Sequence, residues 1–470
     1  MLLSNPPAEL ASYDAADLLG LLTGSTLGKE LLDLHYTAGC TVDVYDLEYG
    51  TVGGKGEPTT ASGALMVPSG AGTACSGPRP IVLYAHGTSA DRDFDIAAIG
   101  TAGDDEGLIL AAVFAAHGYI VVAPNYAGYD ISTLTYHPYL DAQQQAQDMI
   151  DALTAARSAL PVASAPGVTD GHQLFITGYS QGGFVAMATQ RAMQAAGMTV
   201  TAAAPMSGPY ALEAFGDAIF LGEVNASAVV NVALLTASYQ NVYGNLYSAP
   251  TDMFTAPYAA SIATLLPSTT PVSSLYAQGE LPQSALFSGT PPASQYASIT
   301  PATSPASLAP IFALGFGASP LVTNAYRLAY LEDEQANPDG GFPTVTTGLP
   351  AATPANPLRQ DLKTNDLRDW SPTSPVLLCA GDGDPTVFYF NTQLMQSYWT
   401  AHPPAAPVTV LDLDSAAVPG DPYAAMKLAF EAAKAAVQTT GGSLAVLQDY
   451  HATLVPPFCL AAVKAFFDSQ

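Results

Sequence analysis

Basic residues are scarce in this chain. Its 470 residues include 13 lysines and arginines against 40 aspartates and glutamates, which gives a formal net charge of −27. Proteins that bind nucleic acid neutralise phosphates with clustered basic side chains, and the sequence offers no such cluster. An anionic membrane surface would also repel so acidic a protein. We therefore expect no nucleic-acid partner, and a charge that mainly keeps the protein soluble.

Long apolar runs are missing as well. No uninterrupted apolar run approaches the roughly 18–20 residues that span a membrane, so we expect no stable membrane insertion. Residues 1–6 have neither the basic start nor the apolar middle of a signal peptide. The protein is then either cytosolic, or secreted or periplasmic with its signal removed. Hydrophobic residues make up 49% of the chain, which is enough for a sizeable core.

Only four cysteines are present. Cys40 and Cys75 lie in predicted loop positions before strand-like segments, and such positions suit a disulfide in an oxidising compartment. Cys379 and Cys459 could form a second pair. Four cysteines allow three connectivities, and four buried free thiols are the alternative. We expect disulfides, and with them a secreted or periplasmic protein.

The pentapeptide Gly178-Tyr179-Ser180-Gln181-Gly182 is the most informative motif. It matches G-x-S-x-G, follows a strand-like segment at 173–177 and precedes a helix-like segment at 183–191. Strand, sharp turn and helix are the context of a nucleophile elbow, in which a strained turn exposes the serine hydroxyl. The flanking glycines suit positions where a side chain would collide with neighbouring backbone. The sequence therefore predicts Ser180 as a nucleophile.

A carboxylate is expected on a loop after a later strand. Residues 376–380 read as a buried strand, and Gly381-Asp382-Gly383-Asp384 follows them. We favour Asp384, because it lies beyond the turn with Val387 anchoring the loop. Asp382 is the alternative, and an ordinary Asp-Gly turn would also explain the pattern.

The base should come from the end of the chain. Two histidines follow the acid, and we favour His451, in a predicted loop before the final helix, over His402. The remaining histidines precede the acid and are interpreted as structural: His35, His86, His117, His137 and His172.

An oxyanion hole completes such a site. Histidine would take the serine proton, the aspartate would orient the imidazole, and preplaced N–H donors would stabilise the tetrahedral oxyanion. One donor is the backbone N–H of Gln181. His86-Gly87-Thr88 follows the strand-like segment 81–85, and we assign the second donor to the Thr88 N–H, with Gly87 as the alternative.

These motifs together resemble the α/β-hydrolase superfamily. The stretch Ala123-Pro124-Asn125-Tyr126-Ala127-Gly128-Tyr129 is similar to the secretory lipase and esterase branch, which includes the yeast-type lipase A group. That branch often has Asp where Asn125 stands. The resemblance covers roughly residues 40–210 and 372–470 and implies an esterase or lipase.

Strands and helices alternate from about residue 81, which predicts an α/β class with a mostly parallel central sheet and helices on both faces. Residues 8–34 read as helical, and 41–49 and 61–67 as an antiparallel pair. The alternation stops near 208 and resumes near 371, so we expect a core of residues 1–209 and 371–470 and an inserted, largely helical cap at 210–370. Segments 228–243 and 307–331 in this region are helix-like. A separate binding domain is the alternative.

The predicted function is a serine carboxylic-ester hydrolase, an esterase or lipase, that acts through an acyl-enzyme on Ser180. We expect no cofactor and no metal, and a small-molecule or lipid ester as substrate; the sequence predicts no oligomeric state. Acidic residues at 91–95 and 104–106 could bind a cation, but a solvated loop is the favoured interpretation. The alternatives are a serine peptidase or amidase of the same fold and a non-catalytic binding protein.

Overall fold

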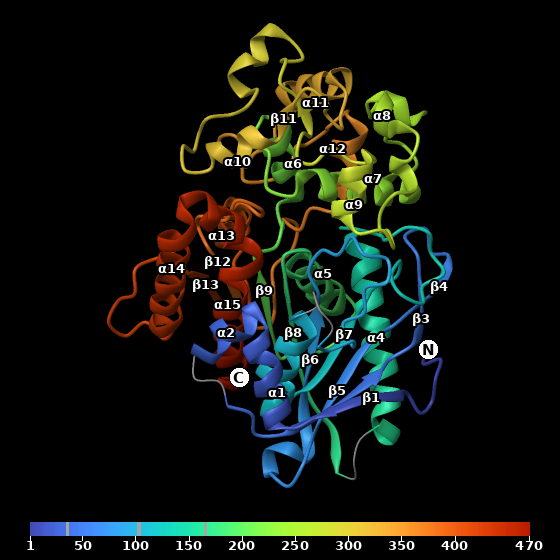
Figure 1. The fold of residues 1–470 in the computed structure, drawn as a ribbon, viewed down its shortest axis with the longest axis vertical. Helices are drawn as coiled ribbons and strands as arrows, with labels where there is room; N and C mark the ends of the chain where they lie inside the picture. The colour runs from blue at the N-terminus through green and yellow to red at the C-terminus, as the bar shows by residue number, and fades with distance from the viewer. Residues whose placement is uncertain (34–36, 101–104, 164–166) are drawn as a thin grey trace.

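The computed structural model describes residues 1–33, 37–100, 105–163 and 167–470. His35 and Asp104, discussed above, lie outside these ranges. A nine-stranded sheet forms the centre of the molecule (Figure 1). Its strands run in the order β1 (Ala8–Tyr13), β2 (Thr41–Asp46), β5 (Gly63–Ser69), β7 (Ile120–Pro124), β6 (Gly77–Ala85), β8 (Val168–Tyr179), β9 (Ala202–Met206), β12 (Val376–Ala380) and β13 (Val408–Asp412).

The sheet is mostly parallel, as the alternation of segments predicts. All neighbours from β7 through β13 pair in parallel, whereas β1, β2 and β5 join by antiparallel pairing at one edge. A separate hairpin, β3 (Tyr49–Val52) with β4 (Pro58–Ala61), interrupts the connection between β2 and β5. The predicted fold class, an α/β-hydrolase fold, is confirmed.

Helices cover both faces of the sheet, so its strands are apolar on both sides. In β6, Ile81 and Leu83 belong to one buried cluster, and Val82 and Tyr84 belong to the other. One face packs against α4 (Ala142–Ala163), α5 (Gln181–Ala195) and α13 (Phe390–Ala401). The other packs against α1 (Ala15–Gly24), α2 (Thr26–Asp33), α3 (Asp105–Val113), α14 (Ala424–Asp449) and α15 (Val455–Asp468).

The N-terminal segment differs from the prediction of one helix over residues 8–34. Residues 8–13 form β1 and pair antiparallel with β2. The helix begins only at Ala15, because the Asp14 side chain accepts hydrogen bonds from the N–H groups of Ala16 and Asp17 and so caps α1. Residues 8–13 form a strand because they pair with β2 at the edge of the sheet. A local sequence pattern cannot predict such long-range pairing.

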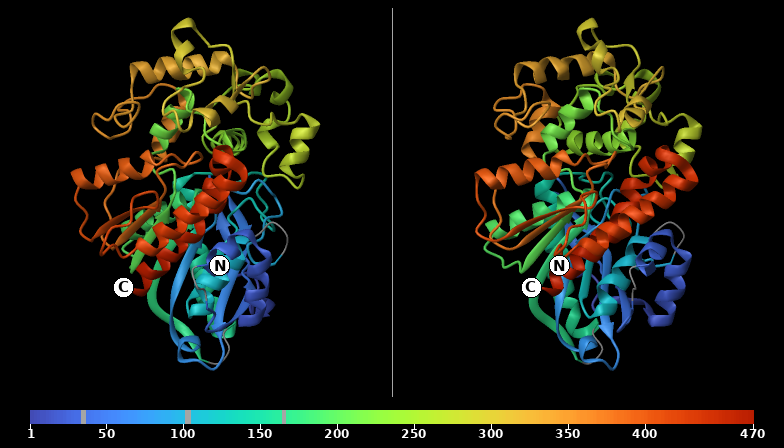
Figure 2. Two further views of the ribbon diagram at one scale, coloured as in Figure 1. Left: turned by 60° about the vertical axis from the view of Figure 1, so that its left-hand side comes forward. Right: turned by 90° about the vertical axis from the view of Figure 1, so that its left-hand side faces the viewer.

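Residues between β9 and β12 contribute no strand to the main sheet. They form an insertion at one end of the molecule, which Figures 1 and 2 show from three sides. Its elements are α6 (Leu212–Phe220), α7 (Ala228–Val242), α8 (Ala256–Ala259), α9 (Val272–Gln278), β10 (Phe287–Ser288), α10 (Ala309–Leu314), β11 (Phe316–Gly317), α11 (Asn324–Ala336) and α12 (Pro357–Thr364). The helix-like stretch 307–331 is split between α10 and α11, because Gly315, Gly317 and Pro320 interrupt it.

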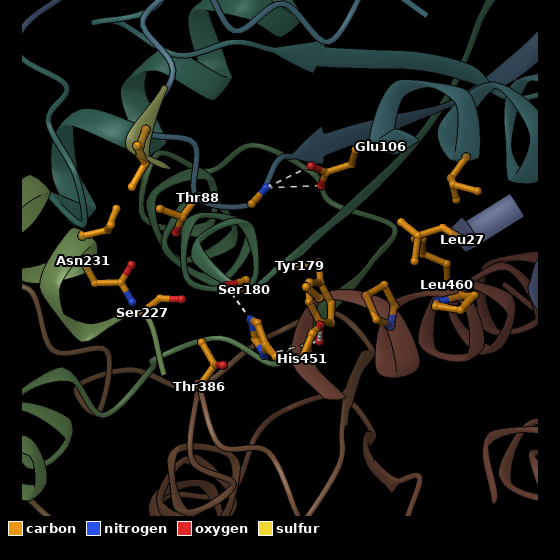
Figure 3. A pocket seen from close by; sticks show the side chains of 18 of the residues that line it. Leu27, Thr88, Glu106, Tyr179, Ser180, Ser227, Asn231, Thr386, His451 and Leu460 are labelled. Atoms are coloured by element: carbon orange, nitrogen blue, oxygen red, sulfur yellow. Dashed lines mark hydrogen bonds between the residues drawn. The ribbon is translucent and has the colours of Figure 1, made fainter. Parts of the chain in front are cut away.

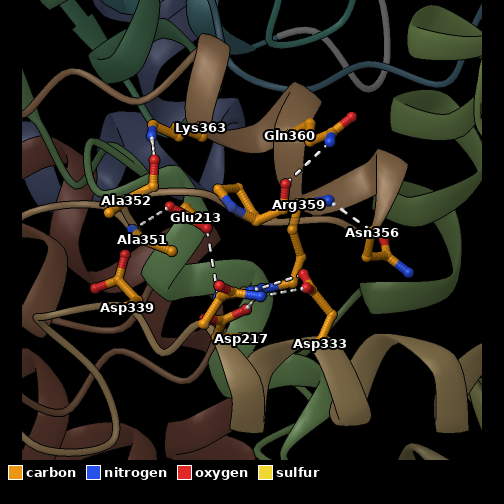
Figure 4. A network of polar contacts seen from close by, with 12 residues as sticks. Glu213, Asp217, Asp333, Asp339, Ala351, Ala352, Asn356, Arg359, Gln360 and Lys363 are labelled. Carbon is orange, nitrogen blue, oxygen red and sulfur yellow. Dashed lines mark hydrogen bonds and ion pairs between the residues drawn. The ribbon is translucent and has the colours of Figure 1, made fainter.

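A buried ion-pair network joins the helices of the insertion (Figure 4). Arg359 of α12 donates through Nε and Nη2 to the two carboxylate oxygens of Asp217 in α6, at 2.9 and 2.8 Å. Its Nη1 donates to Asp333 of α11 at 2.9 Å. Each of these three side chains is at most 7% exposed. One guanidinium therefore links three helices, and its loss would leave buried carboxylates without a cation.

Both disulfides predicted from the four cysteines are present: Cys40–Cys75 and Cys379–Cys459. The second one ties β12 to α15. Among the described residues, one helical run is apolar and long enough to span a membrane by length and composition, residues 424–468, but most of its most apolar window is buried inside the protein.

Candidate active site

Ser180 lies at the turn between β8 and α5. Its backbone has φ 62° and ψ −121°, and non-glycine residues rarely adopt a positive φ. A Cβ on Gly178 would lie 2.4 Å from the Gly182 carbonyl oxygen, and one on Gly182 would lie 1.9 Å from the Ala85 carbonyl oxygen. The glycines are therefore required by the close approach of backbones, and the turn has the geometry of a nucleophile elbow.

The structure brings the three predicted catalytic side chains together. His451 Nε2 lies 2.8 Å from Ser180 Oγ, and His451 Nδ1 lies 2.6 Å from Asp384 Oδ2. The other carboxylate oxygen, Oδ1, accepts hydrogen bonds from the N–H groups of Thr386 and Val387 at 2.8 and 3.0 Å. Asp384 thus fixes the imidazole with Nδ1 as donor, which leaves Nε2 free to accept the serine proton.

His451 does not lie in a loop, contrary to the sequence prediction. It belongs to a π-helical turn, Tyr450–Leu454, that joins α14 to α15. Such turns are widened by one residue and are frequent at functional sites. The hydroxyl of Tyr179 donates to the His451 carbonyl oxygen at 2.6 Å, and the Cys379–Cys459 disulfide joins the strand before the acid to the helix after the base.

The two oxyanion donors predicted from the sequence come from different parts of the fold. The Gln181 N–H is the first of α5, and the first four N–H groups of a helix have no partner within it. The Gly87 N–H donates to the Glu106 carboxylate, at 3.2 and 3.4 Å from its two oxygens. Because that group is already bonded, the geometry favours Thr88 over Gly87 as the second donor, and Thr88 lines the cavity next to Ser180.

The Gln181 side chain is held beneath the elbow by His137. Gln181 Nε2 donates to His137 Nε2 at 2.8 Å, and His137 Nδ1 donates to the Ala127 carbonyl oxygen at 2.8 Å. Burial lowers the pKa of His137 to about 3, so its ring stays neutral and can accept. This histidine is structural, as expected, and it fixes Gln181, whose N–H is the predicted first oxyanion donor.

The alternative acid and base lie outside the site. Asp382 is exposed, and its N–H donates to Asp412. His402 is exposed at the end of α13, with Nδ1 3.1 Å from the Tyr398 carbonyl oxygen. Asn125 is buried and accepts from the Ile96 N–H at 2.8 Å, which is a structural role.

Two cavities of unlike character meet at Ser180. The first, of about 470 Å³, is lined by Ser180 and His451 together with Glu106 and residues of the insertion such as Asn231 (Figure 3). The second, of about 70 Å³, is lined by Ser180 and by mostly apolar side chains of the insertion and the core. His451 lines the first cavity but is not among the described residues that line the second.

Two contributors to this site escaped the sequence analysis. Glu106 had been assigned to a solvated acidic loop, and no local pattern marks it as a neighbour of Gly87. Asn225 of the insertion donates through Nδ2 to the Thr386 carbonyl oxygen at 2.6 Å, and so holds the acid loop. In the described chain, no group of three or more histidine, cysteine, aspartate or glutamate side chains could hold a metal ion, so the acidic residues at 91–95 form no such site.

The site has a serine on an elbow, hydrogen-bonded to a histidine that an aspartate orients. Together with the topology of the sheet, this arrangement defines a serine hydrolase of the α/β-hydrolase fold. The comparisons with known proteins agree. Residues 109–220 match the prolyl oligopeptidase family. No curated protein sequence matches the chain.

Solved structures match over the whole length. The ligand-bound form of the rice cell wall degrading esterase LipA from Xanthomonas oryzae is 27% identical, with a TM-score of 0.70, over 100% of this chain and 98% of that one. A Legionella pneumophila protein, 20% identical over 100% of this chain and 97% of its own, has a TM-score of 0.66 and shows the shared fold. The chain is a member of the α/β-hydrolase superfamily.

Proposed function

We propose that this protein is a carboxylic-ester hydrolase that forms an acyl-enzyme on Ser180. The observation that carries the proposal is the position of Ser180 between two cavities. His451 lines the larger cavity and is not among the described residues that line the smaller one. An ester has two parts, an acyl group and an alcohol, and the site offers one space for each. The similarity to the Xanthomonas oryzae esterase supports the same conclusion.

In the proposed mechanism, His451 removes the proton from Ser180 as the hydroxyl attacks the ester carbonyl. The N–H groups of Gln181 and Thr88 stabilise the oxyanion, and Asp384 stabilises the imidazolium. His451 then protonates the departing alcohol. Water, activated by the same imidazole, hydrolyses the acyl-enzyme and restores Ser180.

The leaving alcohol must lie on the side of the imidazole that protonates it. We therefore assign the alcohol to the larger cavity, which His451 lines, and the acyl chain to the smaller one. Leu212, Phe215 and Leu358 line the smaller cavity, which suits a short apolar chain. The favoured substrates are then esters of short acids.

We further propose that residues 210–370 are a cap over the site, attached to a core of residues 1–209 and 371–470. Ser227, Asn231 and Tyr276 of the insertion line the cavity that contains Ser180. We also propose that the protein is secreted or periplasmic, because both pairs of cysteines form disulfides.

The test is hydrolysis of p-nitrophenyl esters from acetate to palmitate by the wild type and by Ser180→Ala. Ser294→Ala, which changes an exposed serine of the insertion that lines neither cavity, is the matched control. We expect the highest kcat/KM for acetate or butyrate, loss of activity in Ser180→Ala and retention in Ser294→Ala. Equal activity of Ser180→Ala and wild type would overturn the proposal.

The match to the prolyl oligopeptidase family favours a second candidate, a serine peptidase. The matched residues, 109–220, include the elbow, which peptidases and esterases of this fold share. Paired substrates with the same acyl group, one an ester and one a peptide amide, separate the two candidates. Cleavage of the amide without the ester would replace our proposal with the peptidase.

A further inference from the structure

The carboxylate of Asp414 connects the loop that carries the acid to the turn that carries the base. Asp414 lies just after β13. Its Oδ2 accepts hydrogen bonds from the Gly383 N–H, at 3.0 Å, and from the Tyr450 hydroxyl. Gly383 is the residue before Asp384, and Tyr450 is the residue before His451. One side chain outside the triad therefore contacts the chain neighbours of both the acid and the base.

The Tyr450 ring lies against the glycine turn before the acid. A Cβ on Gly381 would lie 2.1 Å from the Tyr450 hydroxyl oxygen, and one on Gly383 would lie 3.2 Å from Tyr450 Cε2. The Gly383 N–H also donates to Tyr450 Oη at 3.2 Å. Burial and the charge of Asp414 raise the pKa of Tyr450, so the phenol stays protonated and continues to donate. Turn, ring and carboxylate are thus packed as one unit.

The remaining contacts of Asp414 hold it in place. Lys434 of α14 donates to Asp414 Oδ1 and also to Glu431. The Asp414 N–H donates to Asp412 Oδ1 at 3.0 Å, and the same oxygen accepts from the Asp382 N–H at 3.1 Å. Asp414 is therefore anchored by its own loop and by α14, and it gives the acid loop and the base turn a common fixed point.

The contacts of His451 within the triad require such alignment. Its Nδ1 lies 2.6 Å from Asp384 Oδ2 and its Nε2 lies 2.8 Å from Ser180 Oγ, so one ring must meet two partners at once. The acid and the base are 67 residues apart in the chain, so their relative position depends on contacts between segments. A misplacement of about 1 Å can slow a well-oriented reaction by about 100-fold.

We propose that Asp414 is a positioning residue of the triad, which acts through Gly383 and Tyr450 to set the acid loop against the turn that carries His451. This inference rests on the proposed nucleophile, Ser180. Asp414 is not among the described residues that line either cavity, so it acts without contact to the substrate. Its role belongs to the hydrogen bonds of the carboxylate and not to its charge.

The test is the rate at which a p-nitrophenyl phosphonate labels Ser180, followed by the release of p-nitrophenolate. Ser180 Oγ forms a bond to phosphorus, p-nitrophenolate leaves, and His451 takes the serine proton. This reaction needs the triad but no ester substrate, so its result does not depend on whether the enzyme cleaves esters or amides. The final number of adducts per chain reports the folded fraction, and the rate constant reports the alignment of the triad.

Asp414→Ala and Tyr450→Phe should lower the second-order rate constant by about tenfold and about threefold, with one adduct per chain in each. Asp414→Asn keeps an oxygen that can accept from Gly383 and Tyr450 but removes the charge, so it should recover most of the wild-type rate. The matched control is Asp421→Ala, which removes an ion pair with Lys427 of the same helix α14. The hydrogen bonds of Asp421 stay within residues 418–427, so this variant should label within about twofold of the wild-type rate.

Three results would overturn the inference. The first is wild-type labelling rates in both Asp414→Ala and Tyr450→Phe. The second is an Asp414→Asn enzyme as slow as Asp414→Ala, because the charge would then matter and not the hydrogen bonds. The third is fewer adducts per chain at an unchanged rate constant, because Asp414 would then act only on folding. Absence of labelling in the wild type would instead overturn the proposed nucleophile, and this inference with it.

Discussion

Glu213 should make the stability of this protein fall as the pH rises, and Glu213→Gln should remove that dependence. Its side chain is fully buried in the insertion (Figure 4). One carboxylate oxygen accepts from the Ala351 N–H at 2.8 Å. The other lies 3.4 Å from Arg359 Nη2, but that guanidinium already donates to Asp217 and Asp333. The carboxylate is therefore poorly compensated for the water it has lost.

Burial raises the pKa of Glu213 from 4.5 to about 8, and Arg359 offsets only part of this effect. A raised carboxyl pKa means that the folded state favours the protonated form, so stability is highest at low pH and falls as the pH rises from 4.5 towards 8. Each pKa unit corresponds to about 1.4 kcal/mol, so the change between pH 5 and pH 8 is about 3 kcal/mol.

The assay is chemical denaturation at pH 5 and pH 8, with the difference in unfolding free energy compared between wild type and Glu213→Gln. The wild type should lose about 3 kcal/mol more than the variant over this interval. Glu332→Gln, an exposed residue of the same insertion, is the matched control and should behave as the wild type. The same difference between the two pH values in wild type and Glu213→Gln would mean that Glu213 does not have the raised pKa.

Three further predictions follow from the geometry of the site. Asp384→Asn should lower kcat by about 10³–10⁴-fold, because the amide cannot stabilise the imidazolium. Steady-state kinetics on p-nitrophenyl acetate would measure this loss. A loss below tenfold would contradict the role assigned to Asp384. Gly182→Ala should abolish activity and destabilise the protein by at least about 2 kcal/mol, because the new Cβ would lie 1.9 Å from the Ala85 carbonyl oxygen. Activity assays together with thermal unfolding test this prediction. A variant as active and as stable as the wild type would be inconsistent with the elbow. Replacing Cys379 and Cys459 by alanine should cost about 4 kcal/mol, because their disulfide spans 80 residues; an unchanged midpoint of denaturation would argue against the bond.

The parts of the site that a local pattern could predict are those fixed by short stretches of backbone. The elbow around Ser180 needs glycines on both sides, so its sequence predicts its shape. The strand at 376–380 agrees with β12, and Asp384 follows it at the expected place. The order of serine, acid and histidine then selected His451, which the structure places 2.8 Å from Ser180.

What the sequence could not predict depends on distant segments. Residues 8–13 form a strand because β2 is beside them, and Glu106 faces Gly87 because α3 packs next to β6. His451 lies in a π-helical turn rather than a loop, and nothing in its neighbours signals the extra residue in that turn. The contact of the Gly87 N–H with Glu106, which favours Thr88 as the proposed second donor, likewise depends on a distant segment.

The most direct test of the central claim is titration of the ester-hydrolysing activity against covalent labelling of Ser180 by a p-nitrophenyl phosphonate. We expect one adduct per chain, located by peptide mass spectrometry on Ser180, with activity falling in proportion to the labelled fraction. Full labelling of Ser180 with undiminished ester hydrolysis, or loss of activity with the adduct on another residue, would contradict it.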